Sequence, residues 1–110
     1  MTDATTPEIS VRELKACAER GEPRVIVDVR DDKEWNLFRI PQAIHLPLAK
    51  VTDSAAEALA RFPDGEVVVY CGHGSRSAKA VALLRAQGIR ASSLAGGIAA
   101  WIDAGEEVDQ

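Results

Sequence analysis

Short apolar runs alternate with helical patterns along nearly the whole chain, and this alternation is the feature that most constrains the fold. Residues 25–29 and 67–70 are almost uninterrupted apolar runs, of the kind that is buried on both faces of a sheet. Residues 43–46 and 91–94 are shorter strand candidates. Strands that alternate with helices predict an α/β domain with a mainly parallel central sheet of about five strands, flanked by helices on both faces.

Helical patterns fill the intervals between these strands. Ser10 and Glu13 form a capping box that opens the first helix, which should end near Gly21. The expected buried face of this helix consists of Leu14, Cys17 and Ala18. Further helices are expected at residues 32–37, at 53–62, from the end of the loop at 71–77 to Gly88, and from Gly96-Gly97 onward. The expected buried faces of the last two are Ala80, Val81, Leu83 and Leu84, and Ile98, Trp101 and Ile102.

The length of 110 residues suits a single domain, since domains typically have about 100–200 residues. We expect it at residues 9–104, after a flexible segment at 1–8 and before an acidic tail at 105–110. No apolar run approaches the roughly 20 residues that a membrane helix needs, so we expect no membrane association. The first residues have neither the basic start nor the apolar stretch of an ordinary secretory signal, so the cytoplasm is the expected location.

Charge is unevenly distributed along the chain, although the net charge is only −4. Residues 67–102 contain no Asp or Glu and carry +4, from Arg76, Lys79, Arg85 and Arg90, whereas the rest of the chain carries −8. An acidic chain with one basic stretch argues against nucleic-acid binding, which usually needs a broad basic surface. The basic stretch does allow a local site for a small anion or an acidic partner.

The chain has two cysteines, Cys17 and Cys71, which are too few and too far apart for a disulfide framework. In a reducing compartment such cysteines are typically free thiols. Zinc sites need clustered Cys and His, and only His45 and His73 are available besides the cysteines, so we expect no metal. Because Cys17 shares a helix face with apolar residues, we expect it to pack in the core.

Cys71 stands directly after an apolar strand and just before a helix, where ligands bind in open parallel sheets. Gly72 and Gly74 allow backbone conformations in which successive amides point inward. Ser75 or Ser77 can cap the helix that follows, and its N-terminus adds positive partial charge. A thiol in that field should have a lowered pKa, and the thiolate is the nucleophilic form.

Two further residues complete this loop. Arg76 adds a full positive charge, with a forked guanidinium that matches an oxyanion. His73 could contact a substrate or act as an acid near neutral pH, and it could equally be an exposed loop tip. The sequence thus points to an activated cysteine, Cys71, in an anion-binding loop.

The loop resembles the active-site loop of single-domain rhodaneses, which commonly read Cys-x-x-Gly-x-Arg-Ser, and its residues here are Cys71-Gly72-His73-Gly74-Ser75-Arg76-Ser77. Other stretches that resemble family motifs are Asp28-Val29-Arg30, Glu34-Trp35, Ile40-Pro41-Gln42-Ala43, and Leu94-Ala95-Gly96-Gly97 with Trp101. The resemblance covers roughly residues 9–104 and implies a rhodanese fold and sulfurtransferase activity.

In such an enzyme Cys71 would attack the outer sulfur of thiosulfate or a protein persulfide, hold a persulfide, and pass its sulfur to a nucleophilic acceptor. The resemblance implies that residues 72–77 bind the substrate, that the loop amides and Arg76 stabilise the anions, and that no metal or organic cofactor is needed. Phe38-Arg39 and Gln42 depart from the family's usual Gly-His and Gly, which bears on the choice of partner. The Arg-Ile-Pro form is similar to rhodanese domains fused to enzymes that activate sulfur-carrier proteins, so such a carrier is a possible partner.

Three alternatives remain open. A phosphatase or arsenate reductase of related fold uses five residues between its Cys and Arg, whereas four separate Cys71 from Arg76. A non-catalytic rhodanese module typically lacks one of these two residues, and this chain has both. A persulfide relay between a desulfurase and a carrier protein would use the same loop. A nucleotide-binding phosphate loop is excluded, because its Lys-Ser/Thr pair is absent.

Residues outside the loop receive structural assignments. Arg30 and Glu34 are expected to pair with each other or with Asp28, and a place at the rim of the site is an alternative. His45 is expected to be a hydrogen-bonded structural residue. The residues expected in the core are Trp35 and Trp101, and those expected in a solvated tail are Asp103, Glu106, Glu107 and Asp109.

Overall fold

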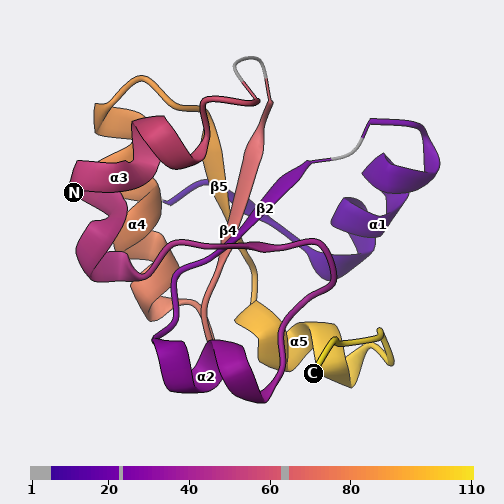
Figure 1. Cartoon of the computed structure of the whole chain (residues 1–110). Coiled ribbons are helices and arrows are strands. Elements are labelled where there is room, and N and C mark those ends of the chain that lie inside the picture. Colours follow the sequence, from indigo (N-terminus) through magenta and orange to yellow (C-terminus); the bar gives the residue numbers. More distant parts are fainter. Residues whose placement is uncertain (1–5, 23, 63–64) are drawn as a thin grey trace.

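The central strand of the sheet is β4 (Val67–Tyr70), which runs through the middle of the molecule (Figure 1). The computed structural model describes residues 6–22, 24–62 and 65–110. The strands lie in the order β1-β5-β4-β2-β3, and all neighbours are parallel. The other strands are β1 (Glu8–Ile9), β2 (Val25–Asp28), β3 (Ile44–His45) and β5 (Ala91–Leu94). Because the strands are parallel, their carboxyl ends meet at one edge of the sheet.

Helices cover both faces of this sheet. They are α1 (Val11–Glu19), α2 (Asp32–Leu37), α3 (Val51–Ala58) with a 3-10 turn η1 (Leu48–Lys50) before it, α4 (Ser75–Ala86) and α5 (Gly97–Asp103). In Figure 1, α3 and α4 lie on one face, α1 and α5 lie on the other, and α2 lies beyond the carboxyl ends of the strands. No helix in the described ranges is both long and apolar enough to cross a membrane.

The side chains of β4 explain why its sequence is apolar throughout. Val67 and Val69 pack into the core cluster formed with α3 and α4, whereas Val68 and Tyr70 pack into the cluster formed with α1 and α5. Successive side chains of a strand point to opposite faces, so a strand covered on both faces buries every residue. The predicted α/β class, parallel sheet and helices on both faces are confirmed.

Several element bounds also agree with the prediction, namely those of α2, β4 and β5. The third helix does not, because it begins at Val51, two residues before the expected start, and ends at Ala58. Val51 is fully buried and joins the core, which extends the helix toward η1. Three residues expected on buried helix faces are exposed, namely Ala18, Leu83 and Ile102.

Both ends of the described chain are more ordered than the sequence suggested. Glu8, expected in the flexible segment, lies in β1, and the amide of Ser93 donates to the carbonyl of Pro7 at 2.8 Å. Residues 1–5 of that segment lie outside the described residues. The backbone of the expected tail folds back onto the domain: Trp101 Nε1 donates to the carbonyl of Glu107 at 2.7 Å, and Asp109 exchanges backbone hydrogen bonds with Arg39 at 2.8 and 3.0 Å. The side chains of Asp103, Glu107 and Asp109 are exposed, as expected for a solvated tail.

Candidate active site

Cys71 lies at the carboxyl end of β4, with its side chain buried. The loop that follows curls around the sulfur, and the amides of Gly74 and Ser77 donate to Sγ at 3.1 and 3.4 Å. α4 begins at Ser75, so the sulfur lies against the first turn of this helix. The structure therefore places backbone donors around the thiol, as the sequence predicted for an activated cysteine.

Two glycines make this backbone path possible. Gly74 has φ +128°, a conformation that side chains rarely adopt. Gly97 has φ +61°, and a Cβ there would overlap the carbonyl oxygens of both Cys71 and Gly72. This close approach lets the amides of Ile98 and Ala99 donate to those two carbonyls at 2.9 and 3.1 Å. The start of α5 thus fixes the first half of the loop.

A buried pair of hydroxyl groups lies behind the sulfur. Ser77 Oγ is 3.5 Å from Cys71 Sγ and 2.7 Å from Ser93 Oγ, and it donates to the carbonyl of Gly74 at 3.1 Å. Ser93 comes from β5 and is nearly inaccessible to solvent. Ser93 was not among the residues predicted for the site, although two adjacent serines inside a predicted strand were a signal of a polar partner.

These contacts decide the ionisation of the thiol. Burial of Cys71 opposes the thiolate, but hydrogen bonding with the Ser77 hydroxyl and with the amides of Ser77, Gly74 and Arg76 favours it. The hydrogen bonds prevail, and the pKa of Cys71 lies below its ordinary value. A larger thiolate fraction makes the cysteine a better nucleophile near neutral pH.

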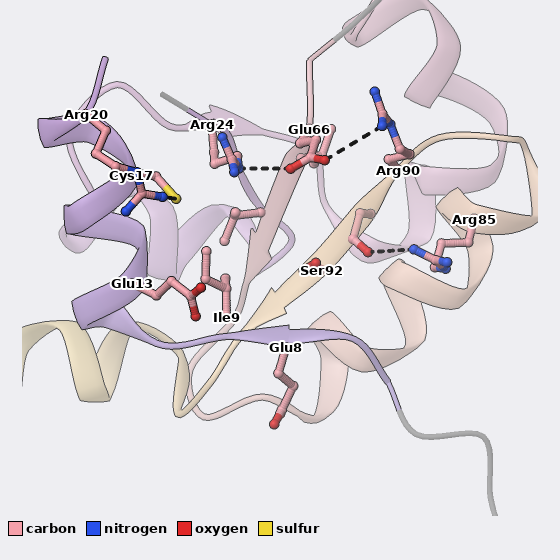
Figure 2. A pocket seen from close by; sticks show the side chains of 13 residues that line it. Glu8, Ile9, Glu13, Cys17, Arg20, Arg24, Glu66, Arg85, Arg90 and Ser92 are labelled. Atoms are coloured by element: carbon pink, nitrogen blue, oxygen red, sulfur yellow. Dashed lines mark hydrogen bonds and ion pairs between the residues drawn. The ribbon is translucent and has the colours of Figure 1, made fainter. Parts of the chain in front are cut away.

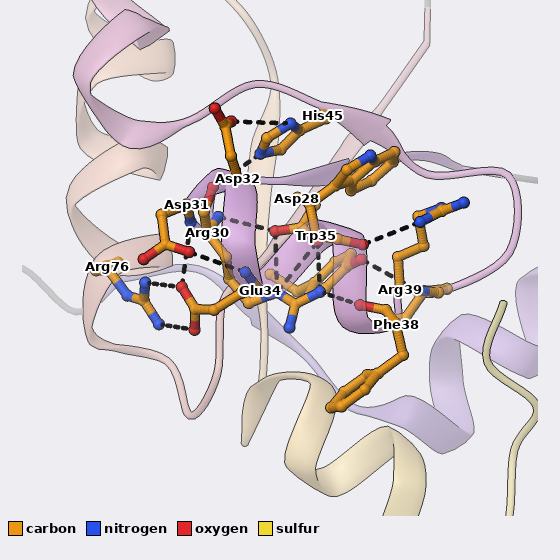
Figure 3. A network of polar contacts seen from close by, with 12 residues as sticks. Asp28, Arg30, Asp31, Asp32, Glu34, Trp35, Phe38, Arg39, His45 and Arg76 are labelled. Carbon is orange, nitrogen blue, oxygen red and sulfur yellow. Dashed lines mark hydrogen bonds and ion pairs between the residues drawn. The ribbon is translucent and has the colours of Figure 1, made fainter. Parts of the chain in front are cut away.

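The guanidinium of Arg76 forms a two-pronged ion pair with the carboxylate of Glu34 in α2 (Figure 3). Its two terminal nitrogens donate to the two carboxylate oxygens at 2.6 and 2.9 Å. Hydrogen bonding from Arg76, with help from the amide of Asp31, lowers the pKa of Glu34 to about 2 although burial opposes this. The prediction that Glu34 pairs with Arg30 or Asp28 is wrong: the rotation of α2 turns it toward the loop.

Arg30 makes the other strong ion pair near the site, and it pairs with Asp28 as predicted. Arg30 Nε lies 3.1 Å from both carboxylate oxygens and Nη2 lies 2.8 Å from one of them, with both residues buried. Nη2 also donates to the carbonyl of Phe38 at 2.6 Å. Burial opposes the charged form of Arg30, but Asp28 outweighs it and raises the pKa of the guanidinium. The ion pair of Asp28 and Arg30 fixes the carboxyl end of β2, just before α2 begins.

The expectations for His45 and for the two tryptophans have different outcomes. His45 Nε2 lies 2.9 Å from the carbonyl oxygen of Arg30, which agrees with a hydrogen-bonded structural role. Trp35 is only half-buried, so its assignment to the core is wrong. Its ring stacks on His45 at 4.7 Å between centroids, and Arg39 covers it at 4.8 Å. Trp101 is buried in the core, as expected.

A pocket of about 270 Å³ borders the loop at Gly72 and His73. Its other walls come from α2 and α5 and include Leu37 and Ile102, which are exposed apolar side chains. His73 and Ser75 are both exposed on the loop. Among the predicted loop residues, Cys71 and Ser77 are therefore buried, His73 and Ser75 face solvent, and Gly72, Gly74 and Arg76 are half-buried.

The second cysteine lies in a different part of the molecule. Cys17 lines a pocket of about 350 Å³ beside α1, where Arg24 and Arg90 both approach Glu66, at 3.1 and 3.8 Å (Figure 2). The structure does not bring Cys17 to the loop of Cys71. Within the described ranges, no group of three His, Cys, Asp or Glu side chains is placed to hold a metal ion.

Comparisons with known proteins agree with this geometry. The protein-family model for the rhodanese-like domain matches residues 10–104 of this chain. YtwF of Bacillus subtilis, which carries the name of a sulfurtransferase, is 35% identical over 86% of this chain and 88% of its own. The maize adenylyltransferase and sulfurtransferase MOCS3-2 is 36% identical over 92% of this chain. The crystal structure of thiosulfate sulfurtransferase from Pseudomonas aeruginosa has a TM-score of 0.84 at 29% identity, over 96% of this chain and 20% of that one.

The comparisons also differ in how much of each relative they cover. This chain spans about a quarter or less of the adenylyltransferase and sulfurtransferase proteins that it matches. The names of the relatives support a general role in sulfur transfer. With the parallel sheet, the loop around Cys71 and a domain match over residues 10–104, the chain belongs to the rhodanese-like domain family.

Proposed function

We propose that this protein is a sulfurtransferase that carries a sulfane sulfur as a persulfide on Cys71. The donor is thiosulfate or a protein persulfide, and the acceptor is a nucleophile. The observation that carries the proposal is the set of donors around Cys71 Sγ, which favours the thiolate in a chain of this family. The name of the Pseudomonas aeruginosa structure supports thiosulfate as one donor.

The reaction has two balanced steps. The Cys71 thiolate attacks the outer sulfur of thiosulfate, a new S–S bond forms, and the old S–S bond breaks with its electron pair leaving on sulfite. The acceptor then attacks the terminal sulfur of the Cys71 persulfide, and the thiolate is released. The charge on the Cys71 side chain is the same before and after the first step, because the thiolate is replaced by a persulfide anion.

We assign roles to the loop residues from their positions. The amides of Gly74 and Ser77, which already reach Sγ, stabilise the thiolate and then the persulfide anion. Arg76 lies on the side of the loop nearest α2, with its guanidinium beside Gly72 and paired with Glu34. His73 and Ser75, being exposed, meet the incoming donor or acceptor at the mouth of the loop.

The test is intact-protein mass spectrometry after treatment with thiosulfate, with and without cyanide. We expect a gain of one sulfur atom that maps to Cys71 and disappears with cyanide, which leaves as thiocyanate. A folded protein that gains no sulfur from thiosulfate or from a protein persulfide would contradict the proposal. Hydrolysis of p-nitrophenyl phosphate through Cys71 would favour the phosphatase alternative instead.

A persulfide relay is the second candidate, and the names of two relatives favour it. YrkF of Bacillus subtilis carries the name of a sulfur carrier protein, and the maize relative joins adenylyltransferase and sulfurtransferase in one name. A relay would take sulfur from a desulfurase persulfide and deliver it to a carrier protein. Faster loading of Cys71 from a desulfurase persulfide than from thiosulfate, at equal concentrations, supports the relay.

The cytoplasm is the location that we propose for this activity. Cys17 and Cys71 are both free thiols, which is the usual state of cysteines in a reducing compartment. A persulfide carrier also needs its cysteine free between cycles. Fractionation of cells that express the protein tests the location.

A further inference from the structure

The ion pair between Glu34 and Arg76 bears on which sulfur donors the site accepts. Resting on the function proposed above, we infer that Glu34 makes the site select sulfane sulfur carried on an apolar group of low charge over the thiosulfate dianion. Glu34 acts as a positioning residue, because it acts through Arg76 and not on the reacting sulfur. Three features of the structure carry this inference.

The first feature is that the charge of Arg76 is already neutralised. Both terminal nitrogens of its guanidinium donate to Glu34, in the fork-to-fork geometry that is the strongest arrangement for this pair. Glu34 is itself held in place by a capping box, in which Asp31 N donates to Glu34 Oε1 at 3.1 Å and Glu34 N donates to Asp31 Oδ1 at 2.9 Å. An anionic donor must therefore compete with a fixed carboxylate for Arg76.

The second feature is that the charges lining the pocket cancel. Arg30 and Glu34 line it, but Arg30 is paired with Asp28 and Glu34 is paired with Arg76. His73, the remaining titratable side chain in the described lining, is exposed to solvent. A dianion that enters this pocket loses water, finds Arg30 already paired, and approaches the carboxylate of Glu34.

The third feature is the apolar wall of the pocket. Leu37 is 67% exposed and Ile102 is 43% exposed, and Ile98 and Ala99, whose amides bind the loop carbonyls, also line the pocket. An apolar cavity of about 150 Å³ can bind benzene, so a pocket of about 270 Å³ has room for an aromatic or branched aliphatic group. These walls recognise the organic part of a donor, which thiosulfate lacks.

The experiment compares three donors that react by the same chemistry. Thiosulfate is a dianion, methanethiosulfonate is a small monoanion, and benzenethiosulfonate is a monoanion with an apolar ring. In each case the Cys71 thiolate takes the outer sulfur, the S–S bond breaks, and sulfite or a sulfinate leaves with the electron pair. We expect wild-type kcat/KM to rise in the order thiosulfate, methanethiosulfonate, benzenethiosulfonate, with at least about a tenfold span.

The deciding variant is Glu34→Gln, which keeps the shape of the side chain and an acceptor for the capping box but removes the charge. We expect the ratio of thiosulfate to benzenethiosulfonate kcat/KM to rise about tenfold, through a lower KM for thiosulfate. The intrinsic reactivity of each donor is the same with both proteins, so it cancels when the ratio for the variant is compared with the ratio for the wild type. Asp32→Asn is the matched control, because it makes the same charge change on the same helix and Asp32 does not contact Arg76.

A second variant tests the apolar wall. Leu37→Ser should lower the preference for benzenethiosulfonate over methanethiosulfonate several-fold, whereas Leu83→Ser, at a half-exposed position on α4, should not. An unchanged donor ratio in Glu34→Gln, or a wild type that prefers thiosulfate, would overturn the inference. If the folded wild-type protein takes sulfur neither from any of the three donors nor from a protein persulfide, the proposed function itself fails.

Discussion

The two cysteines of this chain are equally buried, yet their surroundings differ in the property that decides reactivity. Cys17 is 2% exposed and Cys71 is 1% exposed. Cys17 lies in α1, in a pocket rich in arginine, and Arg20 Nη2 approaches its sulfur at 3.4 Å (Figure 2). Cys71 lies among backbone amides that the loop and α5 hold in position. The difference teaches that two equally buried thiols can lie in unlike surroundings, and the function proposed above rests on the one that is held by fixed backbone donors.

The largest expected effect separates the two cysteines directly. Cys71→Ser should reduce sulfur transfer by at least about a thousandfold, because a serine hydroxyl does not form the persulfide. Cys17→Ser should keep the transfer rate within about twofold and lower stability by about 1–2 kcal/mol, because it replaces a buried thiol with a more polar hydroxyl. Transfer assays and urea unfolding of both variants measure this. Equal loss of transfer in two folded variants would remove the contrast.

The next effect tests whether α5 holds the loop. Gly97→Ala should destabilise the protein by about 3–5 kcal/mol, because the new Cβ overlaps two backbone carbonyls and φ is positive. Gly21→Ala is the matched control: its φ is +76° but no atom lies within 4 Å of its Cβ position, so about 1 kcal/mol is expected. Urea unfolding of the two variants gives both values. Similar losses would mean that backbone strain alone is involved and that the carbonyl contacts add nothing.

The smallest effect concerns the hydroxyl behind the sulfur. Ser77→Ala removes hydrogen bonding that favours the thiolate, so the pKa of Cys71 should rise and alkylation should begin at higher pH. The pH dependence of iodoacetamide alkylation, measured in the Cys17→Ser background, reports this pKa. Ser92→Ala, on the same strand as Ser93 but outside the hydroxyl pair, should leave the midpoint unchanged. A midpoint that stays fixed in Ser77→Ala would show that the amides alone set the ionisation.

Sequence patterns were sufficient for the parts of the fold where local signals agree. β4 is apolar at every position and is followed at once by a glycine loop and a helix, so its bounds and the position of Cys71 could be predicted. The two-residue strand β1 could not be predicted, because two residues have no periodicity. Its pairing with Ser93 is also a contact between segments that are distant in the sequence. The folded-back tail was missed for the same reason, since acidic residues near Val108 conceal its apolar contact.

In the site, the loop was predictable and its ion pairs were only partly so. The motif placed Cys71 and Arg76 in one loop, but the partner of Arg76 depends on how α2 is rotated, which sequence spacing does not specify. The capping box of Asp31 and Glu34 was readable as an acidic residue followed three positions later by Glu. That signal fixes the start of α2 and leaves open which way the second carboxylate points.

The contacts of the loop with α5 and β5 also make its geometry depend on segments that come later in the chain. The carbonyls of Cys71 and Gly72 are bound by residues 98 and 99, and Ser77 is paired with Ser93. During synthesis the cysteine is therefore translated more than twenty residues before the segments that hold its donors. Until β5 and α5 pack, the carbonyls of Cys71 and Gly72 and the hydroxyl of Ser77 lack these partners, so the surroundings of the thiol are completed only by segments that come late in the chain.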